Sequence, residues 1–291
     1  AVPCAAGWRW ASPVPQGFDL TGVAYADALG TFVAVGRAGA MQTSNDGVAW
    51  SPRDIGLADD LNAIAFGNGT FVAVGKRTQT RSPLFITSAD GSAWEARDTT
   101  DHALVETAVT AVAWDGTRFV ALDESGSVWT SPDGKRWPAR GTPIAGVGWF
   151  VPRELVWTGT ELVAAGYGKV TIPGETGGIV LTSRDALTWT VARFASGCRV
   201  ASLASSRDAL VAVGTNGTVA TRTGATWTSA TLDVDFTGVV WTGERFLATG
   251  SNRTDPLAST VYESLDGREW ALADIPVLAR IHAFASGGDR L

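Results

Sequence analysis

Basic and aromatic side chains in segments rich in glycine, proline and polar residues are the first candidates for ligand contacts. A guanidinium group offers paired N–H donors that match carboxylates and sulfates, and an ammonium group acts as a point charge. Trp149 adds a flat apolar surface that suits a sugar ring. The charged residues among these candidates could equally form a solvated loop surface that binds no ligand. The residues predicted to contact a ligand are Arg37, Arg77, Arg81, Trp149, Tyr167, Lys169 and Arg253.

The cysteines and histidines indicate neither a metal centre nor a disulfide-rich scaffold. Cys4 and Cys198 lie far apart in sequence, and only His102 and His282 could assist them, so no zinc-binding spacing occurs. We predict no metal, no cofactor and no catalytic residue. The pairing of the two cysteines stays open, because two cysteines in an exported chain usually pair, whereas the repeat assignment below separates these two.

The composition restricts the partners and the compartment. A net charge of −6 and a pI near 5.0 give no electrostatic reason to expect nucleic acid or an acidic membrane surface as a partner. No apolar run reaches the ~18 residues of a membrane-spanning helix, so membrane insertion is not expected. The sequence opens on Ala1 without a leader, which is how an exported chain looks after signal removal. We expect a monomeric secreted, periplasmic or cell-surface protein.

A repeated segment of the form Ser-x-Asp-Gly-x-x-Trp indicates the elements that position these residues. Near-identical copies end at Trp50, Trp94 and Trp137, and three weaker copies follow. Asp-Gly supplies the positive φ angles of a two-residue hairpin, the carboxylate can accept backbone N–H groups, and the indole covers the hairpin. Function rarely needs six copies, so we assign the repeated residues a structural role. They are Asp46, Trp50, Asp90, Trp94, Asp133, Trp137, Asp185, Trp189, Trp227, Asp266 and Trp270.

A second motif precedes each copy and completes a strand pattern. It reads Phe-Val-Ala-Val-Gly at 32–36 and 71–75, with variants in the other repeats. Each repeat therefore contains four short apolar runs separated by turn residues, which predicts a four-stranded antiparallel sheet. Radial arrays of such sheets are β-propellers, so the fold class is all-β with helices nearly absent.

The spacing of the tryptophans predicts the number of blades. They recur every 38 to 52 residues, at Trp10, Trp50, Trp94, Trp137, Trp189, Trp227 and Trp270. We predict one domain over 1–291, a seven-bladed β-propeller whose last blade is shared by the two termini and lacks about one strand. Such closure removes open sheet edges.

The repeats resemble those of the Asp-box, or BNR-repeat, propellers found in sialidases, secreted glycosidases, photosystem assembly factors and many bacterial surface proteins. The resemblance covers almost the whole chain, although Gly follows Asp directly here and the unit is one residue shorter. It implies a glycan-related or scaffold function. A sialidase mechanism would need an arginine cluster, an acidic Asp and a tyrosine paired with a glutamate. Tyr25 and Tyr262 fall in repeat positions, which leaves Tyr167 as the one tyrosine in an expected loop.

The leading prediction is a non-catalytic binding propeller for a glycan or protein ligand. The contacts are expected at the central pocket and on the face that carries the loops between second and third strands, because insertions in a rigid repeat usually carry binding. Trp149 is expected in a blade connection, and Tyr167 and Lys169 in a long loop that runs to Gly178. A sialidase-like or other secreted glycosidase is the alternative, and an assembly scaffold is a further one.

Overall fold

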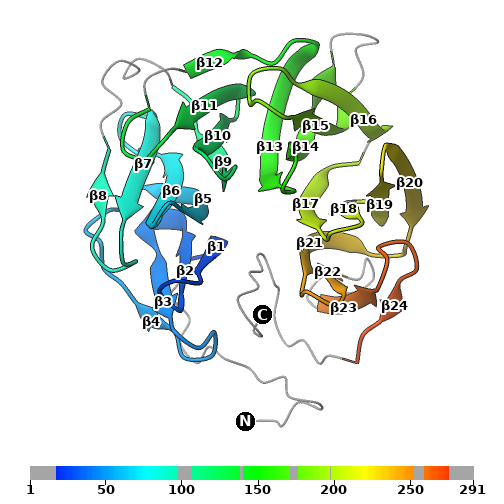
Figure 1. Cartoon of the computed structure of the whole chain (residues 1–291), viewed down its shortest axis with the longest axis horizontal. Helices are drawn as coiled ribbons and strands as arrows, with labels where there is room; N and C mark the ends of the chain where they lie inside the picture. The colour runs from blue at the N-terminus through cyan, green and yellow to red at the C-terminus, as the bar shows by residue number, and fades with distance from the viewer. Residues whose placement is uncertain are drawn as a thin grey trace.

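The computed structural model describes residues 18–97, 106–137, 140–170, 176–196, 198–251 and 259–274. These residues form six four-stranded antiparallel sheets, each with its strands in chain order from the innermost to the outermost. The sheets are arranged as blades around a common centre (Figure 1). The prediction of an all-β propeller is therefore confirmed, with six blades described. The one helical element described is the short 3-10 turn η2 (Arg37–Gly39), and no described helix could cross a bilayer.

The first three blades cover the N-terminal half of the described chain. Blade 1 consists of β1 (Leu20–Ala26), β2 (Thr31–Gly36), β3 (Met41–Ser44) and β4 (Ser51–Pro52). Blade 2 consists of β5 (Asp60–Gly67), β6 (Thr70–Lys76), β7 (Pro83–Ser88) and β8 (Glu95–Ala96). Blade 3 consists of β9 (Val109–Trp114), β10 (Phe119–Asp123), β11 (Ser127–Ser131) and β12 (Arg140–Pro143).

The other three blades follow in the same order. Blade 4 consists of β13 (Val147–Trp157), β14 (Leu162–Val170), β15 (Thr176–Ser183) and β16 (Thr190–Ser196). Blade 5 consists of β17 (Val200–Ser205), β18 (Leu210–Gly214), β19 (Thr218–Thr223) and β20 (Thr226–Thr231). Blade 6 consists of β21 (Asp235–Trp241), β22 (Phe246–Ser251), β23 (Ser259–Ser264) and β24 (Ala271–Leu272).

The two faces of the second strand in blade 2 pack against different neighbouring blades. In β6, Phe71 and Ala73 belong to the apolar cluster shared with blade 1, whereas Val72 and Val74 belong to the cluster shared with blade 3. Successive side chains of a strand point to opposite faces, so a continuous apolar run serves two interfaces at once. This arrangement explains why the second-strand motif is apolar at nearly every position.

The predicted seventh blade rests on residues outside the described part of the chain. Trp10 and Cys4 lie in 1–17, and the C-terminal segment expected beside them lies in 275–291. His102 and His282 are outside the described residues as well. Cys198 is described and is buried.

The Ser-x-Asp unit forms a turn with one pattern of hydrogen bonds. In blade 1, the Asp46 carboxylate accepts backbone N–H groups of Val48 and Ala49 at 2.8 and 2.7 Å, and the hydroxyl of Ser44 at 3.0 Å. The indole N–H of Trp50 donates to the Gly47 carbonyl at 3.1 Å. Equivalent bonds occur in blades 2, 3, 4 and 6. The backbone donors of Thr188 and Leu187 lower the pKa of Asp185 to about 2.

Two details of these turns differ from the prediction. The connection in blade 1 runs from 45 to 50 and is longer than a two-residue hairpin, because the carboxylate folds several N–H groups around itself. Blade 5 does have a two-residue hairpin, Gly224-Ala225, and no aspartate stands there. Trp227 accordingly lies within strand β20 instead of closing a carboxylate-centred turn.

We expect Trp137→Ala to lower the free energy of unfolding by about 3 to 5 kcal/mol, as for a large buried aromatic. Trp137 is 4% exposed, stacks on Phe85 at a centroid distance of 4.2 Å and donates to the Gly134 carbonyl. Trp50→Ala is the matched comparison, and it should cost clearly less because Trp50 is only half-buried. Chemical denaturation of both variants measures the difference. Equal losses, or no loss at Trp137, would contradict this account.

Candidate ligand-binding site

The innermost strands of all six blades surround a central channel, which contains a cavity of about 170 Å³. Each inner strand carries a β-bulge at the same position in its register, which leaves one residue without a partner in the second strand. These unpaired residues are Thr21, Asn62, Thr110, Arg153, Ala201 and Thr237. Four of the six are neutral polar residues, and Arg153 carries the one charge.

The bulges place hydrogen bonds between neighbouring blades. The Thr21 hydroxyl donates to the Leu61 carbonyl of the next blade at 2.7 Å, and the Asn62 amide donates to Val109 in the same way at 2.9 Å. Between blades 5 and 6, Ser202 exchanges bonds with the backbone of Val239 at 3.2 and 3.3 Å. Polar side chains at the channel wall thus join blades whose other contacts are apolar.

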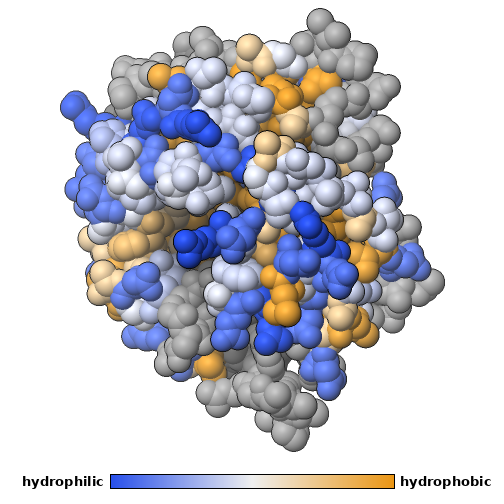
Figure 2. All heavy atoms as spheres, turned by 45° about the vertical axis from the view of Figure 1, so that its right-hand side comes forward, coloured by the Kyte–Doolittle hydropathy of each residue, from blue (hydrophilic) through white to orange (hydrophobic). Residues whose placement is uncertain are grey.

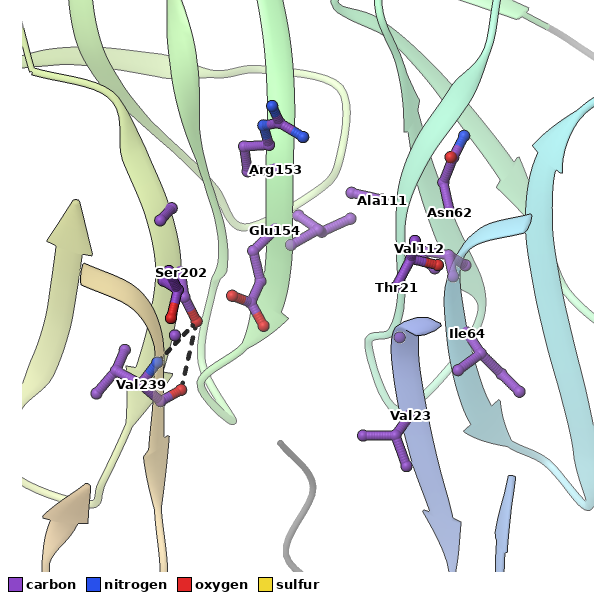
Figure 3. A pocket seen from close by; sticks show the side chains of 16 residues that line it. Thr21, Val23, Asn62, Ile64, Ala111, Val112, Arg153, Glu154, Ser202 and Val239 are labelled. Carbon is purple, nitrogen blue, oxygen red and sulfur yellow. Dashed lines mark hydrogen bonds between the residues drawn. The ribbon is translucent and has the colours of Figure 1, made fainter. Parts of the chain in front are cut away.

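The junction of blades 4 and 5 uses a carboxylate for this purpose. Glu154 follows the bulge of β13, and its Oε2 accepts the backbone N–H of Leu203 at 2.8 Å. The side chain is half-buried at the channel wall, beside Ser202 (Figure 3). Burial raises the pKa of Glu154 to about 7, and this effect outweighs the hydrogen bonds from Ser202 and Leu203, which lower it. Sequence reasoning missed this residue, because one acidic residue in an apolar strand carried no motif.

Blade 4 has longer inner strands than its neighbours at the loop end of the ring. We use loop end for the end that carries the turns between second and third strands and the blade connections. β13 starts five residues before Pro152, which flanks its bulge, whereas β5 starts one residue before the matching Leu61. The extra length is about 13 Å at ~3.3 Å per residue. The pair Trp149↔Lys169 lies within this extension, and the pair Val151↔Tyr167 at its base is the counterpart of Asp60↔Lys76 in blade 2.

Trp149, Tyr167 and Lys169 therefore lie in strands, and their expected placement in loops is wrong. Strand β14 pairs with β15 without a register shift from Leu162↔Ser183 to Lys169↔Thr176, so Tyr167 and Lys169 lie in regular strand. The three residues do come together. The rings of Trp149 and Tyr167 are in contact, and Lys169 is the direct cross-strand partner of Trp149.

Arg199 joins these residues from the connection between blades 4 and 5. Its guanidinium carbon lies 4.8 Å from the Tyr167 ring centroid, and that ring meets Trp149 edge-on at 5.4 Å. Trp149 is 37% exposed, and both cationic side chains are exposed. We name Trp149, Tyr167, Lys169 and Arg199 the aromatic ledge. Sequence reasoning missed Arg199, whose one signal was its place immediately before an inner strand.

The predicted arginines of blades 1 and 2 form a separate, partly neutralised group. Arg77 lies 4.0 Å from Asp59, and Arg81 lies 3.9 Å from Glu106. Arg37 is exposed in η2, and the next residue donates its N–H to Asp60 at 3.0 Å. Lys76 also lies 3.6 Å from Glu124. Acidic residues of the blade connections and of the turn after β10 thus partly neutralise the charge of these basic side chains.

The site predicted as one pocket is thus divided. Arg37, Arg77 and Arg81 belong to blades 1 and 2, the aromatic ledge belongs to blade 4 and its junction with blade 5, and Arg253 lies outside the described residues. Figure 2 shows one side of the molecule, on which hydrophilic side chains predominate and hydrophobic ones form small separate groups. Trp149 is one of six large hydrophobic residues that are exposed in the described chain.

The described tyrosines pack against other aromatic rings. Tyr25 lies 4.3 Å from Phe32 and Tyr262 lies 5.8 Å from Phe236, both between ring centroids. These contacts agree with the repeat positions assigned to the two residues. Tyr167 lies between Trp149 and Arg199. The structure thus provides no evidence of catalysis at these residues.

Comparisons with known proteins show the fold. No known protein family matches the chain by sequence, and no curated protein is similar to it. YCF48 from Cyanidioschyzon merolae is similar in structure, with a TM-score of 0.65 and 14% identity over 92% of this chain and 88% of that one. A structure of YCF48 bound to D1 peptide has a TM-score of 0.65 and 18% identity, over 89% and 83%. The RRP9 WD40 repeats reach 0.69 with 11% identity, over 97% and 87%.

The raised pKa of Glu154 predicts a pH dependence of stability. The folded state binds this proton more tightly than the unfolded state, whose carboxyl has a pKa near 4.5. The contribution of Glu154 to stability is therefore full below about pH 4.5 and is lost as the pH rises to about 7. Glu154→Gln should remove this loss. As the pH rises from about 4.5 to about 7, the free energy of unfolding of the variant should therefore increase by about 1 to 3 kcal/mol relative to that of the parent.

Denaturation at a series of pH values measures this difference. Glu244→Gln is the matched control for the change of residue type, because Glu244 is 83% exposed. A flat difference for Glu154→Gln would show that the carboxyl titrates normally.

Proposed function

We propose that the chain is a non-catalytic binding propeller that takes a segment of another protein on the aromatic ledge. The observation that carries the proposal is the three-stranded extension of blade 4, which presents Trp149 and Lys169 at the loop end, next to Tyr167 and the Arg199 guanidinium that lies over it. A propeller of similar fold, YCF48, has been solved with a D1 peptide bound, which supports a protein ligand as the class to test first.

The residue types of the ledge suit a protein ligand. Tryptophan, tyrosine and arginine dominate the energetics of protein interfaces, because they bury a large area and keep a polar group for orientation. Here the aromatic pair stands on paired strands instead of a mobile loop, so little conformational entropy is lost on binding. Lys169 and Arg199 add two positive charges and favour a segment with acidic side chains or a free carboxylate.

A glycan is the competing ligand, because a tryptophan face also stacks on sugar rings. In the ledge, however, Trp149 meets Tyr167 at an interplanar angle of 64°, so the two rings do not form one flat platform. Rings set at this angle offer a protein side chain two differently oriented apolar surfaces, whereas a sugar ring stacks on one flat face. A test must therefore present peptides and glycans side by side.

We further propose that segments 1–17 and 275–291 complete a seventh blade between blades 6 and 1. The support is the sequence pattern at Trp10 and the position of blades 1 and 6 at the two ends of the described array (Figure 1). Without such a blade, the face of blade 1 that is turned away from blade 2 and the face of blade 6 that is turned away from blade 5 would be exposed to solvent.

Deletion of residues 1–10 should therefore destabilise the whole ring and cause self-association, because it opens sheet edges. Light scattering and thermal melts of the truncated and full chains measure this. A truncated chain that is as monomeric and as stable as the parent would reject the seventh blade.

Selection of a random-peptide phage library on the immobilised protein, beside a glycan array, tests the ligand class. We expect enriched acidic peptides whose affinity falls at least about tenfold in Trp149→Ala, the usual effect of losing an interface hot spot. Leu187→Ala is the matched control, since Leu187 is 79% exposed on an aspartate-centred turn away from the ledge. Peptides that bind both variants equally, or binding of glycans alone, would overturn the proposal.

A further inference from the structure

The layer of residues that follows the bulges is unusually open around the channel. At this register position, five blades carry Gly22, Ala63, Ala111, Ser202 and Gly238, and blade 4 carries Glu154. All six residues line the cavity. One long acidic side chain therefore borders a space that the small side chains of the other blades leave unfilled.

The next layer along the strands is apolar. It consists of Val23, Ile64, Val112, Leu155 and Val239, which line the same cavity. The cavity volume of about 170 Å³ is close to the ~150 Å³ that accommodates benzene in an engineered protein cavity. The channel thus has room for a group of that size beside the carboxylate (Figure 3). Four of the apolar residues, Ile64, Val112, Leu155 and Val239, are mostly buried between blades and expose only a small part of their side chains to it.

The charges that line the channel favour a cation at Glu154. Arg153 is the other charged residue in the lining, and the lining residues from β1, β5, β9, β17 and β21 are all uncharged. The Arg153 and Glu154 side chains diverge along the channel, so the guanidinium does not cover the carboxylate (Figure 3). One carboxylate among hydroxyl and aliphatic groups is a poor set of ligands for Ca²⁺ or Mg²⁺, which take six or more oxygens, and it lacks the histidine or cysteine ligands that Zn²⁺ prefers.

We propose that the channel binds a primary alkylammonium group, with the ammonium on the Glu154 carboxylate and the aliphatic part in the space that the small side chains leave open. Such a group occurs in small free amines and in lysine side chains. The inference concerns the channel alone and does not depend on the protein ligand proposed for the aromatic ledge.

Protons compete with this ligand. Burial raises the pKa of Glu154 to about 7, so the carboxyl is largely neutral at about pH 5.5 and largely ionised at about pH 8. An amine needs the ionised form, and its affinity should fall at least about tenfold between the higher and the lower pH.

Calorimetric titration at about pH 8 with pentylamine, pentan-1-ol and pentanoate tests the proposal on the full chain. We expect pentylamine to bind, to lose at least about tenfold in affinity in Glu154→Gln, and to keep its affinity in the control Glu244→Gln and in Arg153→Gln. Equal binding of pentan-1-ol would show a merely apolar cavity. Binding of pentanoate that is lost in Arg153→Gln would show an anion site, and either result overturns the proposal, as does the absence of pentylamine binding.

A second titration separates the two sources of the amine. Competition by Nα-acetyl-lysine-N-methylamide supports a lysine side chain as the occupant, and binding of pentylamine alone supports a small free amine. The peptide selection with Trp149→Ala reports on the ledge independently, so failure at the channel and failure at the ledge are distinguishable.

Discussion

The inner strands around the channel lie very close to the second strands of their own blades at the bulges, and in every described blade except blade 3 this close approach depends on glycine. A Cβ atom on Gly75 would overlap the carbonyl oxygen of Asp60, and one on Gly36 would overlap that of Asp19. Glycine at the end of the second strand lets the bulged inner strand lie this close. The bulges in turn direct polar side chains toward the next blade, so the blade-to-blade bonds follow from the same crowding.

Blades 3 and 4 depart from this regular pattern, because an acidic residue stands where the other blades have glycine or another small residue. Asp123 replaces the second-strand glycine in blade 3, and its carboxylate accepts N–H groups of Ser127 and Trp129 at 3.0 and 3.2 Å. Glu154 replaces a small residue in blade 4, and the same blade carries the longest inner strands. The junction of blades 4 and 5 also contains an ion pair of Glu161 with Arg222. Most of the polar specialisation described here therefore gathers at one junction.

The repeat made the fold predictable, and the same repeat limited what could be predicted of the site. Turn chemistry and periodic apolar runs depend on neighbours in sequence, so the strands, the aspartate-centred turns and the blade order follow from the residues. The extension that carries Trp149 and Lys169 has no counterpart in the other described blades, and its glycines indicated a loop. The ion pairs of Arg77 and Arg81, the contact of Arg199 with Tyr167 and the burial of Glu154 depend on which blades meet in space. No local pattern contains that information.

The hairpin that closes blade 5 leaves a different kind of outer edge. β20 runs for six residues, Thr-Trp-Thr-Ser-Ala-Thr, without a charge or a proline, whereas β4, β8 and β24 are two residues long. Among the described outer strands, the comparably long β16 carries Arg193. Outer strands are usually kept from pairing with other molecules by shortness, charge or proline. β20 has none of these protections, so in concentrated solution it is the described edge at which one molecule would first add its sheet to that of another.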